Sequence, residues 1–129
     1  MNREIKFRAW DKSEKIMYSS NCINLLIYFN GQLQSSNEYG KLLGTINTPK
    51  MKIMQYTGLK DKNGKEIYEA DIIKNTQGYL EEVAFVNGSF QTASIKYPNA
   101  NLHLLDTYSE YIEVIGNIYE NPELLEVTE

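Results

Sequence analysis

Three Asn-Gly pairs constrain the fold of this 129-residue chain more than any other feature of its sequence. They stand at residues 30–31, 63–64 and 87–88. Asparagine and glycine adopt left-handed backbone angles at low cost, so each pair favours a tight turn between two strands. The chain also carries ten Tyr, four Phe and one Trp, residue types enriched in strands. Frequent turns between short strands predict a mainly β protein with a small barrel.

The first fifty residues predict a hairpin followed by a less regular stretch. Residues 5–10 alternate apolar and polar side chains and 16–18 return as a second strand, which gives an N-terminal hairpin within residues 1–20. Residues 23–29 form a third apolar stretch. Residues 32–49 are rich in Ser, Asn and Gly and have little periodicity, so we expect an exposed loop or a lineage-specific insertion there. We therefore treat residues 21–50 as a variable segment.

Residues 51–125 are expected to form an SH3-like barrel core. Its strands are expected at 51–57, 71–74, 79–86, 89–97 and 111–119. The pair Asn63-Gly64 is expected to form a type I′ turn, and Gly116 inside the last strand suggests a bulge or a close backbone crossing. Pro122 after Asn121 predicts a single short helical turn near the C-terminus. We expect one domain over residues 1–129.

Composition excludes several classes of site. Cys22 and His103 are the only cysteine and histidine, so an internal disulfide and a Cys/His zinc cage are excluded. No apolar run reaches the roughly 18 residues that cross a bilayer. Residues 1–20 carry charges throughout and hold no apolar core of a signal peptide. We expect a cytoplasmic protein with no membrane partner.

The net charge of −4 is unevenly distributed along the chain. Residues 1–65 carry eleven Lys and Arg against five Asp and Glu, a net charge of +6, and residues 66–129 carry two Lys against twelve acids, a net charge of −10. One interpretation is an anion-binding half, with nucleic acid as the partner. The other is that the two halves neutralise each other, within one fold or between subunits.

No set of residues in the sequence indicates an active site. His103 would need an orienting carboxylate to act as a general base, and Asp106 is too generic a neighbour to provide evidence for one. Glu81 and Glu82 are adjacent on a strand and point to opposite faces, so we interpret them as solvated surface charge. Phosphate-binding loops and serine elbows are also absent from the sequence. We expect no enzyme activity, no catalytic residue, no cofactor and no metal.

Basic residues interleaved with aromatic residues form the remaining candidate site. Such a pattern is found where small barrels bind single strands, and where aromatic and arginine side chains anchor protein interfaces. The alternative is that the aromatic rings belong to the core and the lysines keep the hairpins soluble. The candidate interaction surface comprises Arg8, Trp10, Lys52, Tyr56, Lys62 and Lys65.

Three stretches of the chain together resemble the YopX family of bacteriophage and prophage proteins. They are residues 3–11 (REIKFRAWD) with Met17 and Tyr18, residues 54–69 (MQYTGLKDKNGKEIYE) and residues 111–124 (YIEVIGNIYENPEL). The resemblance implies a mostly β, barrel-like domain from phages of Gram-positive hosts, of unknown function and with no known catalytic residue. The family typically has Gly before the aspartate of its YEGDI segment. This chain has Ala70 there. If the position needs a positive φ, alanine should cost about 1 kcal/mol, but we expect that the position needs only a small residue.

Resemblance and residue pattern together favour a phage accessory protein without catalytic activity. We expect it to act in the bacterial host cell by contact with an unknown protein or with a second copy of itself. The alternative is a nucleic-acid-binding barrel that uses the basic N-terminal half. An enzyme is the least supported class, because its site would consist of acids and tyrosines alone.

Overall fold

The computed structural model describes residues 4–19, 24–27, 33–36, 42–46, 51–97 and 102–126. These residues are mainly β, with antiparallel strand pairs and short 3₁₀ helices. The mainly β prediction is confirmed. The chain divides into two compact units, which are described separately below. The N-terminal unit is Lys6–Gln55, and the C-terminal unit is Tyr56–Glu129 with Met1–Ile5.

The N-terminal unit begins with the expected hairpin. Strands β1 (Phe7–Asp11) and β2 (Ile16–Tyr18) pair antiparallel. The Asp11 carboxylate accepts the backbone N–H groups of Ser13 and Glu14, which holds the connecting turn. Strand β6 (Met51–Lys60) starts in this unit and pairs antiparallel with β1 over Met51–Gln55. Ala9 and Met51 are buried side by side between these strands.

The variable segment contains more strand than its sequence predicts. Strands β3 (Asn24–Ile27), β4 (Leu33–Ser36) and β5 (Leu42–Ile46) form an antiparallel three-stranded sheet. Strand β3 lies within the apolar stretch 23–29. The prediction of a loop over 32–49 is wrong for β4 and β5, because backbone pairing forms there without an alternating apolar pattern. Asn30, Gly31 and Cys22 lie outside the described residues.

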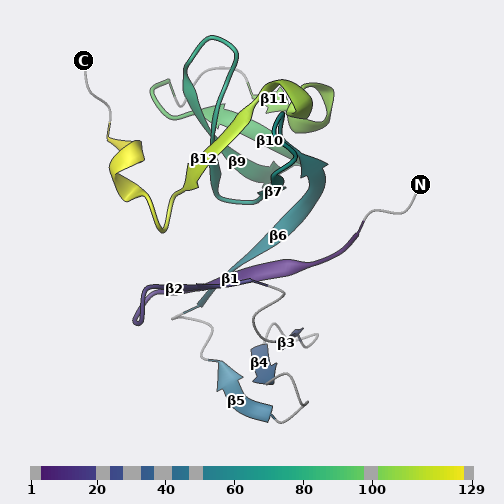
Figure 1. Cartoon of the computed structure of the whole chain (residues 1–129), viewed down its shortest axis with the longest axis vertical. Helices are drawn as coiled ribbons and strands as arrows, with labels where there is room; N and C mark the ends of the chain where they lie inside the picture. The colour runs from purple at the N-terminus through teal and green to yellow at the C-terminus, as the bar shows by residue number, and fades with distance from the viewer. Residues whose placement is uncertain are drawn as a thin grey trace. The chain divides into compact units, whose positions relative to one another are not determined.

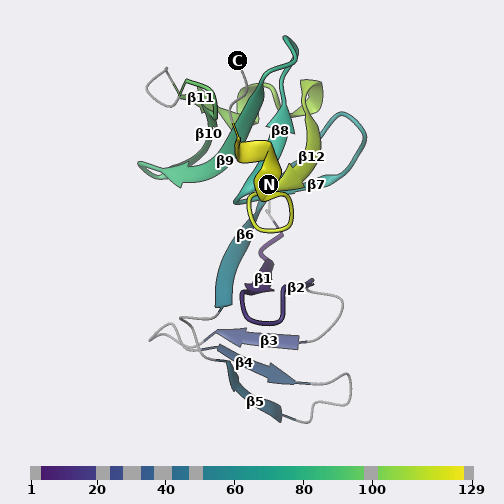
Figure 2. The same cartoon turned by 90° about the vertical axis from the view of Figure 1, so that its left-hand side faces the viewer.

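The C-terminal unit is built around one antiparallel sheet. The described strands that lie wholly in this unit are β7 (Glu66–Tyr68), β8 (Asp71–Lys74), β9 (Leu80–Val86), β10 (Ser89–Ser94), β11 (His103–Leu104) and β12 (Glu113–Asn117). The sheet order is β11-β10-β9-β8-β12, and β7 pairs with the second half of β6. The sheet curls into a half-barrel (Figure 1), and β12 lies beside β8 in Figure 2.

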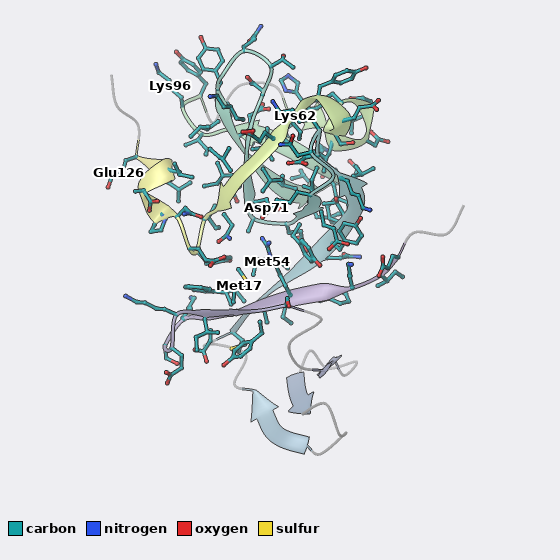
Figure 3. All side chains as sticks on the ribbon, in the orientation of Figure 1. Met17, Met54, Lys62, Asp71, Lys96 and Glu126 are labelled. Atoms are coloured by element: carbon teal, nitrogen blue, oxygen red, sulfur yellow. The ribbon has the colours of Figure 1, made fainter. Side chains whose placement is uncertain are left out.

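The core of this unit fills the inside of the curled sheet. Its buried side chains come from strands far apart in the sequence, and Leu59, Phe90 and Tyr108 pack against them. Asp71 lies inside the unit, whereas Lys96 points outward from it (Figure 3). Burying six aliphatic side chains stabilises the fold by about 10 kcal/mol before entropy is counted. These six are Ile67, Ile73, Val83, Leu105, Ile112 and Val114.

The two described Asn-Gly turns differ from each other. At Asn87-Gly88 both residues have positive φ, 50° and 85°, between the paired residues Val86 and Ser89, as a type I′ hairpin requires. At residues 63–64 only Gly64 has positive φ, at 81°. The Gly64 N–H donates to the carbonyl of Asp61, and the type I′ prediction is wrong there. The longer loop forms because the Asp61 carboxylate accepts the N–H groups of Asn63 and Lys65.

Three 3₁₀ helices complete the C-terminal unit. Helices η2 (Leu105–Thr107) and η3 (Ser109–Tyr111) precede β12, so the last strand starts later than the predicted residue 111. Helix η4 (Pro122–Leu125) is the expected C-terminal helical turn. A register shift between Val114 and Gly116 confirms the expected bulge. The prediction of a single domain stays a prediction. Among the described residues, no helix combines the length and apolar character needed to cross a bilayer.

Candidate functional site

The C-terminal unit has an open pocket of about 770 Å³ beside the outer edge of its sheet. The turn between β8 and β9 forms one wall, and β11 with the two 3₁₀ helices that follow it forms the other. Both walls therefore belong to the same unit, and β9 contributes the residue between them. The lining residues are Asn75, Thr76, Gln77, Glu81, Leu102, His103, Leu104, Thr107, Tyr108 and Tyr111.

Glu81 provides a buried carboxylate at this pocket. It lies on β9 with only 3% of the residue exposed. Its Oε1 accepts from the hydroxyls of Thr92 and Tyr108, both at 3.4 Å. Its Oε2 lies 3.2 Å from His103 Nδ1. A buried carboxylate needs such partners, because desolvation of an unpaired charge costs several kcal/mol.

His103 lies on the edge strand β11 and contacts both Glu81 and Tyr108. Its side chain is 57% exposed, so one side of the imidazole faces solvent while Nδ1 faces the carboxylate. The rings of His103 and Tyr108 meet edge to face, with centroids 5.9 Å apart. Glu81 therefore fixes the orientation of the imidazole, in the same way that a carboxylate orients many functional histidines.

The Tyr108 hydroxyl links the buried carboxylate to Thr92. Its oxygen is hydrogen bonded to the Thr92 hydroxyl and also lies near Glu81. The pKa of Tyr108 is raised from 10.0 to about 12. Burial is the largest cause; the Thr92 hydrogen bond acts to lower the pKa, and the charge of Glu81 acts to raise it. The phenol therefore stays neutral and keeps its proton to donate.

The rim of the pocket is apolar and unusually exposed. Leu102 is 40% exposed, Leu104 49% and Tyr111 60%. On the opposite wall, the Asn75 side-chain carbonyl accepts the N–H groups of Gln77 and Tyr79, which fixes the β8–β9 turn. An apolar rim around a polar floor, on a rigid wall, is the common arrangement of a binding pocket.

The sequence alone singles out His103 without assigning it to a site, and it misjudges Glu81. His103 was expected to need a carboxylate, and the structure supplies Glu81 rather than Asp106. The expectation that Glu81 is solvated is wrong, because the residue is almost fully buried. Its neighbour Glu82 is half-buried on the opposite face, where burial raises its pKa. The alternation along β9 contained the missing signal, since Glu81 shares its face with the core residue Val83.

The predicted interaction residues do not come together at this pocket. Trp10 is 8% exposed and Tyr56 is 4% exposed, with the Tyr56 ring against Tyr68 at 5.4 Å. Arg8 is half-buried, and its Nε donates to the sulfur of Met54. The remaining members are exposed, Lys52 in the N-terminal unit and Lys62 and Lys65 in the C-terminal unit. Their joint role as an interaction surface stays a prediction.

The described residues hold no group of three or more His, Cys, Asp or Glu side chains placed to bind a metal ion. Within the same residues, no Ser, Thr or Cys nucleophile is hydrogen bonded to His103. The arrangement can accept hydrogen bonds, hold a positive charge and cover an apolar group.

Fold and pocket together define a small, mainly β protein with an antiparallel half-barrel and an open pocket. The chain belongs to the YopX family, since the family model described as YopX protein matches residues 6–126. It is 31% identical over 128 residues to the SPbeta prophage-derived uncharacterized protein YopX of Bacillus subtilis (strain 168), covering 93% of this chain and 95% of that protein. The resemblance deduced from the sequence is confirmed.

Two solved structures share the fold along nearly the whole chain. Protein EF1440 from Enterococcus faecalis is 30% identical, with a TM-score of 0.66. Protein yopX from Bacillus subtilis is 28% identical, with a TM-score of 0.68. Each comparison covers 97% of this chain and 100% of the other. The fold described above is therefore the fold of the family.

Proposed function

We propose that this YopX-family protein works by binding another protein through the pocketed face of its C-terminal unit, without bond-making chemistry. The observation that carries the proposal is the exposed apolar rim, Leu102, Leu104 and Tyr111, around an open pocket. Exposed apolar groups gathered at one concave site are typical of interaction surfaces, and aromatic side chains are enriched in them.

The charge of the C-terminal unit favours a protein partner over nucleic acid. Residues 56–129 carry five Lys against thirteen Asp and Glu, a net charge of −8. Polyphosphate is repelled from such a surface, because nucleic-acid affinity comes largely from Lys and Arg contacts with phosphates. A unit with a negative net charge instead attracts a basic protein surface.

The His103–Glu81 pair raises the competing possibility of acid–base catalysis. An oriented imidazole is half of that machinery, and the reaction also needs a nucleophile or a group that stabilises developing negative charge. Thr107, Asn75 and the tyrosines are the other hydrogen-bonding groups on the described walls, together with Thr76 and Gln77. Tyr108 is hydrogen bonded to Thr92 and Glu81. We therefore assign the pair to recognition.

The proposed setting is the cytoplasm of a bacterial host cell. The Bacillus subtilis relative is named as a prophage-derived protein. A phage or prophage accessory protein made there meets host and phage proteins as partners, and a second copy of the chain is included among them.

The test is capture from lysate of infected host cells, with and without nuclease treatment, by three baits. These are the natural chain, the rim variant Leu102→Ser/Leu104→Ser, and a control variant Tyr97→Ser. Tyr97 is 55% exposed and lies outside the pocket, so it matches the rim in exposure. We expect a protein that the natural chain and the control retain and the rim variant loses. Equal capture by all three baits, or capture that nuclease abolishes, contradicts the proposal.

A further inference from the structure

The pocket holds one buried carboxylate, and no other acidic side chain is among its described lining residues. Glu81 is the carboxylate in the lining, and 4% of its side chain is exposed. A charge in a largely desolvated position acts over a longer range than one in water, because the surrounding dielectric is lower. The pocket therefore selects for the charge of its occupant.

His103 lies beside this carboxylate at the pocket, with its Nδ1 3.2 Å from Glu81 Oε2. In the tautomer that donates Nδ1–H to Glu81, the imidazole leaves Nε2 as a hydrogen-bond acceptor. Most of the imidazole side chain is exposed at the pocket. The occupant that satisfies this acceptor must be a donor, and it gains most when it is also positively charged.

The aromatic and apolar walls fit the rest of an arginine side chain. Tyr108 and Tyr111 present rings at the same pocket, and a guanidinium is attracted to an aromatic face within about 6 Å. Leu102 and Leu104 offer apolar surface for the aliphatic stem of such a side chain. Arginine has five N–H donors, no acceptor and a planar group that stacks on rings, so it matches the floor and walls together.

We propose that the pocket formed by Glu81, His103, Tyr108 and the rim is a receptor for an arginine side chain on a partner protein. The proposal rests on the proposed function, because it names the chemistry of the partner at the same face. Apolar residues beside that arginine contact the rim, and the net charge of −8 on residues 56–129 draws a basic segment toward it.

The experiment compares two capped tripeptides as probes, Ac-Leu-Arg-Leu-NH₂ and its citrulline analogue, on the full-length chain. Citrulline has nearly the shape of arginine and no charge. Amide and side-chain shifts are followed by two-dimensional NMR during titration. We expect the arginine peptide to shift the signals of His103, Tyr108 and Tyr111, and to bind at least about tenfold more tightly than the citrulline peptide. Equal affinity for the two peptides overturns the proposal without any substitution.

Two variants and a control locate the binding. Glu81→Gln is expected to remove the preference for arginine over citrulline. Tyr111→Ala, at an exposed ring that the core does not need, is expected to weaken arginine binding in a folded protein even if Glu81→Gln is unstable. The control Glu110→Gln removes an exposed acid that does not line the pocket. If Glu110→Gln weakens binding of the arginine peptide as much as Tyr111→Ala does, the proposal is overturned, because the peptide is then held by the net charge of the surface and not by the pocket.

Failure of the arginine-receptor proposal can be distinguished from failure of the proposed function. Capture that depends on the rim, combined with equal binding of the two peptides, refutes the arginine receptor and leaves the proposed function intact. Arginine selectivity at the pocket, combined with capture that ignores the rim, refutes the proposed function and leaves the receptor for arginine in place.

Discussion

Ala70 adopts a backbone angle that few residues other than glycine adopt cheaply. Its φ is 72°, and it is buried at the start of β8. Its N–H donates to the Val83 carbonyl and its own carbonyl accepts from Ile118, so the sheet holds it in this conformation. The expectation that the position needs only a small residue is therefore wrong. Glycine, the residue typical of the family at this position, adopts a positive φ without steric cost, whereas the Cβ of Ala70 makes this backbone conformation strained.

Replacing Ala70 with glycine tests this directly. We expect Ala70→Gly to stabilise the fold by about 1 kcal/mol, because relief of the left-handed strain exceeds the extra entropy of glycine in the unfolded chain. Chemical denaturation measures the change. The matched control is Ala84→Gly on β9, where φ is not positive, and a loss of stability is expected there. A destabilised Ala70→Gly contradicts the strain argument.

Tyr108 makes the stability of the protein sensitive to alkaline pH. Its pKa is raised from 10.0 to about 12 in the fold, chiefly by burial, so the folded state disfavours the phenolate. Its contribution is fully present below pH 10.0 and is lost as the pH rises to about 12. Tyr108→Phe is therefore expected to be less stable near neutrality but to lose less stability over that window. Thermal melts at a series of pH values measure how steeply the stability of the natural chain and of Tyr108→Phe falls with pH. Tyr97→Phe, at an exposed ring, is the control. Parallel slopes would exclude this role for Tyr108.

At the scale of elements, Asp61 fastens the β6–β7 loop to the last strand. Besides the N–H groups of Asn63 and Lys65, its carboxylate accepts the N–H of Val114 at 2.9 Å. Burial acts to raise the pKa of Asp61, and the three backbone hydrogen bonds with the charge of Lys65 outweigh it, so the net shift is downward. Its contribution to stability is present above the ordinary pKa of 3.8 and is lost as the pH falls below it.

Asp61→Ala tests this link between elements. We expect a loss of about 2 kcal/mol or more at neutral pH, because three donors lose a charged acceptor and one of them is buried. The difference from the natural chain should shrink in acid, where Asp61 becomes protonated. Urea denaturation at two pH values measures both effects, and Asp106→Ala, at an exposed acid, is the control. A cost as small as that of the control would show that the loop is held by other contacts.

Local signals in the sequence predict elements where pairing partners are close in the chain. The alternation and turn residues placed β1, β2, β8 and the β9–β10 hairpin, since each depends on neighbours a few residues away. Strand β11 was missed because it depends on backbone pairing with β10, and helix η2 was missed because its Leu105 is buried against strands distant in the sequence. Helix η3 was missed because it buries no residue of its own and leaves no apolar pattern. The turn at Asn63-Gly64 also shows that a side chain outside the Asn-Gly pair, here the Asp61 carboxylate, can override the turn type that the pair favours by itself.

The candidate site was harder to predict than the fold for the same reason. His103 and Glu81 are 22 residues apart, and only the pairing of β9, β10 and β11 brings them together. The alternation along β9 predicts that Glu81 and Val83 lie on the same face of the strand, but it does not predict that Glu81 lines a pocket. The burial of Trp10 and Tyr56 was likewise an alternative in the sequence, which tertiary packing decided.

At the scale of the whole molecule, the two units differ in charge. Residues 56–129 carry a net charge of −8, and residues 6–55 carry seven Lys and Arg against three acids, a net charge of +4. The nucleic-acid alternative therefore depends on the N-terminal unit and on the exposed lysines Lys62 and Lys65. Lys62 and Lys65 lie within an acidic unit, where the neighbouring carboxylates offset their attraction for phosphate.

Heparin chromatography over a salt gradient decides between the two partners for the full chain. We expect the natural chain to elute at low salt and the triple variant Arg8→Gln/Lys62→Gln/Lys65→Gln to elute at nearly the same salt, because phosphate contacts are few. A nucleic-acid-binding barrel would instead show affinity falling steeply with salt, with a smaller slope in the triple variant, since each phosphate contact adds about one to the slope. That result would assign the function to the basic residues and not to the pocketed face of the C-terminal unit, since only basic side chains supply phosphate contacts of this kind.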